Sequence, residues 1–200
     1  MTGMMAAALL AATGVVGELP KLEDARLETF LTEVYGKRPV ERPQELWFSD
    51  IYPPELFSRY PEKGIRRKID AFRRIVVCHY RGPYGEGSFR FTVFLPPNAK
   101  KPVPAYLYIS LSYGCGDIDP WRDVQNERWP AEEIVDRGYA AIAFAREEVS
   151  PECYDKTRAY KEGVFRCFED PTKPRPPDAW GALSAWAWAG REWPPPYRSS

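Results

Sequence analysis

The sequence predicts an α/β fold, in which a mixed β-sheet starts with an antiparallel pair and continues with parallel strands. Two segments of alternating apolar and polar residues, joined by a turn-rich stretch, predict the antiparallel pair. Further along, an apolar strand, a short helix and a second apolar strand follow one another, which is the pattern of a βαβ unit. Together the two patterns favour a twisted sheet with helices packed on it.

The first predicted element is an amphipathic helix over residues 25–35 (ARLETFLTEVY). Gly36 follows it directly and Pro39 stands just beyond, and both residues favour the end of a helix at this point. Four apolar residues at helical spacing form its predicted buried face: Leu27, Phe30, Leu31 and Val34.

The antiparallel pair is predicted over residues 72–80 (FRRIVVCHY) and 88–95 (SFRFTVFL), with the turn in residues 82–87. The run from 102 to 111 (PVPAYLYISL) is apolar throughout, as expected for a central parallel strand covered on both faces. Residues 129–138 then predict a helix that ends at Gly138, and residues 139–145 (YAAIAFA) a second buried strand. A last helix is predicted over residues 178–189 as the next crossover.

The ends of the chain differ from its middle. Residues 1–18 include an apolar run (MMAAALLAATGVV) that is too short to span a bilayer and has no preceding Lys or Arg. We interpret it as a weak signal segment or a frayed helix, and the missing positive charge favours a cytoplasmic location over secretion. Residues 19–190 form the predicted partial domain, and residues 191–200 are an aberrant Pro-rich tail.

Charge and cysteine content exclude several classes of function. The chain has 28 Lys plus Arg and 28 Asp plus Glu, so no net field attracts nucleic acid or an anionic membrane. His79 is the only histidine and the four cysteines contain no CxxC pair, so we expect no zinc site and no other cofactor. The single histidine also argues against a metal-dependent deacetylase.

Three segments with matching order and spacing resemble the glucuronoyl esterases of carbohydrate esterase family fifteen and their bacterial acetylxylan-esterase-like relatives. They are residues 128–144 (RWPAEEIVDRGYAAIAF), 162–165 (EGVF) and 178–189 (DAWGALSAWAWA). Residues 30–39, 93–97 and 101–108 are similar to that family's lead-in helix and first strands, so the resemblance covers roughly residues 19–190. It implies the N-terminal half of an α/β hydrolase that cleaves carboxylic esters, in characterised members those of 4-O-methyl-glucuronic acid on xylan.

The chain departs from the family where the resemblance implies a nucleophile turn of the form Gly-His-Ser-Arg-x-Gly-Lys. Three prolines, Pro194 to Pro196, stand there instead, and they cannot continue a helix. No serine lies in a Gly-x-Ser-x-Gly elbow either. We therefore expect no catalytic residue in this chain, a truncation before the nucleophile strand, and an inactive product. Whether a frameshift, an early stop or a misassembled gene end causes the truncation stays open.

The loop after the strand at 102–111 contains the best candidate site residues. In α/β hydrolases this loop supplies one backbone N–H to the oxyanion hole, and here it contains Tyr113, Gly114, Cys115 and Gly116. A plain strand-to-loop turn is an equally good interpretation. Trp121 and Trp129 flank the loop as candidate ligand-facing aromatics, whereas Trp180, Trp186 and Trp188 are expected to pack in the core. A Cys115 nucleophile with His79 as its base is a minor alternative.

Two functions of different class therefore stay open. The first is an ester hydrolase fragment, whose family acts on a polysaccharide or small ester substrate by a Ser-His-acid mechanism. The second is a non-catalytic product or an interaction module. In the family's fold the nucleophile strand lies beside the strand from Ala105 to Leu111, so its loss leaves an apolar sheet edge that favours self-association.

Overall fold

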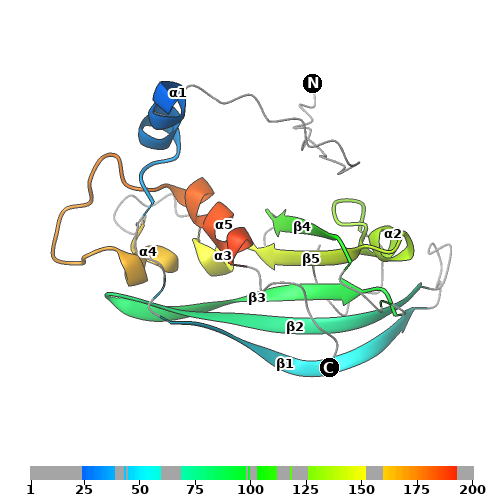
Figure 1. Ribbon diagram of the computed structural model, residues 1–200. Coiled ribbons are helices and arrows are strands. Elements are labelled where there is room, and N and C mark those ends of the chain that lie inside the picture. The colour runs from blue at the N-terminus through cyan, green and yellow to red at the C-terminus, as the bar shows by residue number, and fades with distance from the viewer. Residues whose placement is uncertain are drawn as a thin grey trace.

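The computed structural model describes residues 24–38, 43, 45–59, 69–97, 99, 103–111, 118, 126–151 and 160–192. Within these residues a five-stranded mixed sheet has the order β1-β2-β3-β5-β4 (Figure 1). The strands are β1 (Glu45–Arg59), β2 (Ile69–Gly82), β3 (Gly85–Leu95), β4 (Ala105–Ser110) and β5 (Ala140–Ala145). The helices are α1 (Asp24–Thr29), the π-helical turn η1 (Phe30–Val34), α2 (Ala131–Asp136), α3 (Arg146–Val149), α4 (Val164–Phe168) and α5 (Ala182–Arg191).

The antiparallel start of the sheet confirms the predicted hairpin. Strands β2 and β3 pair without a register shift from Phe72 opposite Leu95 to Gly82 opposite Gly85. Both strands extend beyond the predicted ranges, and the connecting turn is shorter than expected, with only Pro83 and Tyr84 between them. The α/β class with an antiparallel start is therefore correct.

Strand β1 was not predicted. It pairs antiparallel with β2 along the outer side of the hairpin, and its register shifts twice, between Asp50 and Tyr52 and again between Tyr52 and Glu55. Pro53 and Pro54 fall inside the second shift. Because proline cannot donate to a β-ladder, such a strand is tolerated at an edge with an irregular register.

The predicted βαβ unit is present. Strand β4 pairs in parallel with β5 from Ala105 opposite Ala140 to Ser110 opposite Ala145, and α2 lies between them in the chain. All six residues of β5 are buried, as expected of a strand between two neighbours. In contrast, β4 is not covered along its whole length, since its first three residues are exposed, and it is the edge strand of the described sheet.

The opening helix forms, but not as an ordinary amphipathic one. It is α-helical over α1 and continues as η1, and Gly36 then adopts the positive φ of 76° that ends the helix. The predicted buried face is exposed by between 41% and 57% at its four residues, so it is not part of the described core. The chain after it is tied to the segment before α5, where the Lys37 N–H donates to the Asp178 carbonyl at 2.6 Å and the Gly181 N–H to the Tyr35 carbonyl at 2.9 Å.

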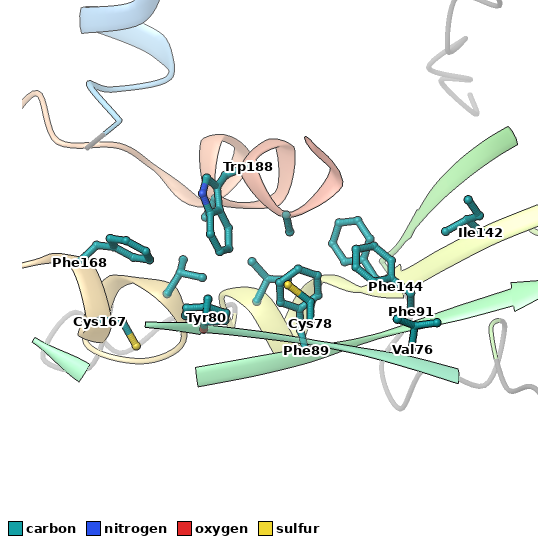
Figure 2. Close-up of a cluster of buried hydrophobic side chains, with 14 of the residues drawn as sticks. Val76, Cys78, Tyr80, Phe89, Phe91, Ile142, Phe144, Cys167, Phe168 and Trp188 are labelled. Atoms are coloured by element: carbon teal, nitrogen blue, oxygen red, sulfur yellow. The ribbon is translucent and has the colours of Figure 1, made fainter. Parts of the chain in front are cut away.

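Side chains alternate between two apolar clusters, one on each face of the sheet. In β5, Ile142 and Phe144 belong to the larger cluster, whereas Ala141 and Ala143 belong to the smaller one. Residues of α3, α4 and α5 complete the larger cluster, and α2 covers the smaller one. Figure 2 shows the larger cluster, with the Trp188 indole of α5 above the aromatic side chains of the hairpin and of α4.

The last helix is shorter than predicted and begins at Ala182 rather than at residue 178. Trp180 lies before it, yet both Trp180 and Trp188 are buried in the larger cluster, and Trp186 is partly buried against it. The expectation that these three rings pack in the core is confirmed. Helices α3 and α4, of four and five residues, were not predicted.

Candidate functional site

The carboxyl ends of β4 and β5 meet at one edge of the sheet. Ser110 and Ala145, the last residues of the two parallel strands, are register partners, so the segments that follow both strands leave from the same place. In open α/β sheets, ligands bind outside the carboxyl ends of the strands. This edge is therefore the part of the described fold where a site is expected.

Arg146 brings a guanidinium group to this edge. It directly follows β5, is the first residue of α3 and is only 9% exposed. Its Cζ atom lies 5.4 Å from the ring centre of Trp186 on α5, within the range of a cation–π interaction. The Trp186 indole N–H in turn donates to the Ser150 carbonyl at 3.4 Å. Helices α3 and α5 thus hold a largely buried cation next to the strand ends, where it can stabilise a negative charge.

Sequence reasoning did not select Arg146 or Ser110, which is 1% exposed at the end of β4. A signal was present for Arg146, because a charged residue follows an entirely apolar strand without any intervening turn residue. The contact with Trp186 had no local signal, since the two residues are forty positions apart in the chain.

The predicted oxyanion-loop residues Tyr113, Gly114, Cys115 and Gly116 lie outside the described residues, and so does Trp121. The last described residue before them is Leu111, which follows Ser110 at the end of β4. Their assignment stays a prediction.

Trp129 does not face a ligand in this structure. Its side chain is 1% exposed and belongs to the smaller apolar cluster. Its ring lies 5.7 Å from that of Phe94 and is stacked at 6.5 Å on that of Tyr108. A position beside a loop suggested that the ring could meet a ligand, but it packs in the smaller cluster with residues of β3, β4 and α2.

His79 lies on β2 with partners from β1. Its Nε2 atom is 2.8 Å from the Ser49 hydroxyl, and its ring stacks on that of Trp47 with centres 5.0 Å apart and planes 7° from parallel. Strands β1 and β2 are at the opposite end of the sheet order from β4, after which the Cys115 loop follows. The sequence-based expectation that a lone histidine in a strand is structural agrees with these contacts.

Two cysteines are described, and neither is suited to nucleophilic chemistry. Cys78 and Cys167 are free, buried thiols in the larger cluster. Burial raises the pKa of Cys78 to about 12, with a smaller contribution from the charge of Glu192, and burial also raises the pKa of Cys167. Because the thiolate is the reactive form, both groups are inert at neutral pH.

No group of three or more His, Cys, Asp or Glu side chains among the described residues is placed to hold a metal ion. None of the helices found there is long and apolar enough to cross a membrane.

Comparison with solved structures finds similar proteins among the glucuronoyl esterases. The Solibacter usitatus glucuronoyl esterase matches 84% of this chain with a TM-score of 0.64 and 25% identity. A family 15 glucuronoyl esterase from Teredinibacter turnerae matches the same share with a TM-score of 0.62 and 26% identity. A promiscuous family 15 esterase from a marine bacterial metagenome, at 21% identity and a TM-score of 0.58, shares the fold.

The matched region spans less than half of these proteins, 45% of the first and third and 40% of the second. No family model and no curated protein sequence matches the chain. The chain therefore resembles the glucuronoyl esterases of carbohydrate esterase family 15 and, over the part of them that it covers, has their α/β hydrolase fold.

Proposed function

We propose that this chain forms part of a carboxylic ester hydrolase that acts on glucuronoyl or acetyl esters of a xylan-type polysaccharide. The observation that carries the proposal is the similarity to two glucuronoyl esterases at 25% and 26% identity over 84% of the chain. The carboxyl ends of β4 and β5 meet at one edge of the described sheet, which is where α/β folds bind their ligands.

The proposed role of this chain is to shape the ester-binding edge. The loop from Tyr113 to Gly116 would donate a backbone N–H to the oxyanion that forms when a serine attacks the ester carbonyl. Arg146, which contacts Trp186 at the end of β5, would stabilise the negative charge of the oxyanion or of a uronic acid carboxylate. Both roles are electrostatic, and neither requires a nucleophile from this chain.

The nucleophile itself is proposed to come from residues outside this sequence. None of its serines stands in a Gly-x-Ser-x-Gly elbow, and the Ser49 hydroxyl, though 2.8 Å from His79, lies on β1, whose backbone is committed to a β-ladder. We therefore expect these 200 residues alone to hydrolyse no ester.

The test compares two purified proteins, this chain and the same chain extended through the next open reading frame. Each is assayed with p-nitrophenyl acetate and with methyl glucuronate. Turnover by the extended protein alone is the expected result. Turnover by the 200 residues, retained after purification and lost in Ser49→Ala or Cys115→Ala, would contradict the proposal that the nucleophile lies elsewhere.

A second candidate function is supported by the exposed edge of the sheet. Strand β4 is the last strand in the described sheet, and Tyr106 and Leu107 on it are 36% and 42% exposed. An apolar edge of this kind can pair with a strand of another molecule. The chain would then act as a non-catalytic interaction module that associates through residues 105–111.

Light scattering coupled to size exclusion separates the two candidates. Self-association that Leu107→Lys abolishes, in a chain without esterase activity in either form, would favour the interaction module. A monomer in dilute solution would contradict it. Leu183→Lys, at a residue that is 56% exposed on α5, is the matched control for an added charge.

A further inference from the structure

The outer end of the sheet carries an aromatic and polar surface that the proposed esterase chemistry does not use. Register pairs place its residues on one face, because Glu45 is opposite Arg81, Trp47 is opposite His79, and Arg81 is also opposite Glu86. Their chain neighbours Cys78 and Tyr80 point into the larger apolar cluster on the other face. We call this surface the hairpin patch, and it consists of Glu45, Trp47, Ser49, His79, Arg81 and Glu86.

Trp47 is the centre of the hairpin patch. Its side chain is 41% exposed, which is unusual for a ring this large, and the imidazole of His79 covers one side of it in a nearly parallel stack. The hydrogen bond between His79 Nε2 and the Ser49 hydroxyl, at 2.8 Å, fixes the imidazole in turn. The indole is therefore supported on one side by a fixed imidazole, and much of the residue stays exposed to solvent.

Planar polar groups stand beside this ring on the same face. Arg81 donates from Nη1 to Glu45 at 3.0 Å and from Nη2 to Glu86 at 3.2 Å, and all three side chains are at least 45% exposed. Two carboxylates offset the one guanidinium, so the patch presents hydrogen-bonding groups without a net positive charge. Such a surface has nothing to attract a polyanion, and it suits a neutral ligand with many hydroxyl groups.

We propose that the hairpin patch binds a neutral stretch of polysaccharide, with one pyranose ring packed on Trp47. The C–H bonds on one side of a pyranose are weakly positive and match the negative face of an aromatic ring. The ring hydroxyls would bond to the carboxylates and the guanidinium around Arg81. The choice of xylan as that polysaccharide rests on the proposed function, whereas the binding mode depends on the patch alone.

The experiment is affinity electrophoresis of the full 200-residue chain in native gels that contain soluble xylan. Trp47→Ala should raise the dissociation constant for xylan, obtained from the retardation, by roughly three- to tenfold, because one ring-stacking contact is lost. Phe30→Ala is the matched control, because Phe30 is a 49% exposed ring on η1, away from the patch, and should retain full binding. Circular dichroism of each variant checks that the fold is intact.

Two results would overturn the proposal. They are a wild-type chain that neither xylan nor an unsubstituted β-glucan retards, and a folded Trp47→Ala variant that binds as the wild type does. Retardation by the β-glucan but not by xylan would support the binding mode and overturn the choice of xylan. Failure of the esterase proposal is seen separately, because hydrolysis of p-nitrophenyl acetate and methyl glucuronate requires no polysaccharide chain. Retardation through Trp47 without esterase activity in the extended protein would keep the binding site and remove the proposed function.

Discussion

Replacement of Trp188 by alanine should strongly destabilise the fold. Trp188 is 6% exposed on α5 and packs against the rings of Tyr80 at 5.3 Å, Phe168 at 5.7 Å and Phe89 at 6.1 Å (Figure 2). It is the ring through which α5 contacts both the hairpin and α4. Truncation of a buried Trp or Phe to Ala costs about 3–5 kcal/mol, because apolar contacts are lost and a cavity is left.

Urea unfolding followed by far-UV circular dichroism measures this loss. With a typical slope of about 2 kcal/mol per molar, a loss of about 4 kcal/mol lowers the unfolding midpoint by about 2 M. Leu183→Ala is the matched control in the same helix, because Leu183 is 56% exposed and should change stability by less than about 0.5 kcal/mol.

Equal midpoints for the two variants would refute the reasoning. That outcome would mean that α5 does not pack on the hairpin in solution, and the arrangement of Arg146 and Trp186 at the strand ends would then be unsupported as well.

Three further predictions follow from the backbone and from titrating groups. Gly36→Ala should destabilise the fold clearly more than Gly138→Ala. Both glycines have a positive φ, which alone costs an alanine about 1–2 kcal/mol, but of the two only Gly36 would place the new Cβ 2.1 Å from a carbonyl oxygen. Equal urea midpoints for the two variants would contradict this prediction. Burial raises the pKa of Cys78 to about 12, so the contribution of this thiol to stability is fully present below the ordinary thiol pKa of 9.0 and is lost as the pH rises toward 12. Iodoacetamide, followed by peptide mass spectrometry, should label Cys78 in urea but not in the native protein. Fast labelling of the native protein would refute the burial of Cys78. Hydrogen bonds from the hydroxyl and the N–H of Thr172 lower the pKa of Asp170 to about 2, so the Asp170 carboxylate stabilises the fold above about pH 4, and this contribution disappears as the pH falls toward 2. Asp170→Asn should therefore reduce the difference between the urea midpoints measured at pH 5 and at pH 2.5. An unchanged difference would count against this role of Asp170.

The elements that the sequence predicts well are those whose signal is local. The hairpin of β2 and β3 alternates in the simple period of a strand, and β5 is apolar from end to end, so both were found. Strand β1 was missed because Pro53 and Pro54 argue against a strand, and only pairing with β2 shows that register shifts accommodate them. Helices α3 and α4 are too short to show a helical period.

Burial was harder to predict than secondary structure. The apolar pattern of β4 indicated a strand covered on both faces, yet its first three residues are exposed, because periodicity identifies a face without telling what covers it. Trp129 shows the converse, since its position beside a loop suggested exposure while its ring is fully packed. Both errors concern neighbours that are distant in sequence.

The candidate site depends on the same long-range information. Arg146 and Trp186 come together only because α5 packs beside α3, and the pairing of Ser110 with Ala145 arises from the parallel register. The loop from Tyr113 to Gly116 was selected from its position after a predicted strand and from its two glycines, and its role stays a prediction.

The junction between the segment after η1 and the segment before α5 has a consequence for the order in which the chain folds. The Tyr35 carbonyl accepts hydrogen bonds from the Gly181 N–H and from the Ser184 hydroxyl, 149 positions later in the chain. During synthesis the hairpin and the βαβ unit can pair while most of their partners are close in sequence, but Tyr35 must wait until α5 has left the ribosome. Helix α1 and η1, although they precede the sheet in the chain, would thus be among the last of the described elements to dock.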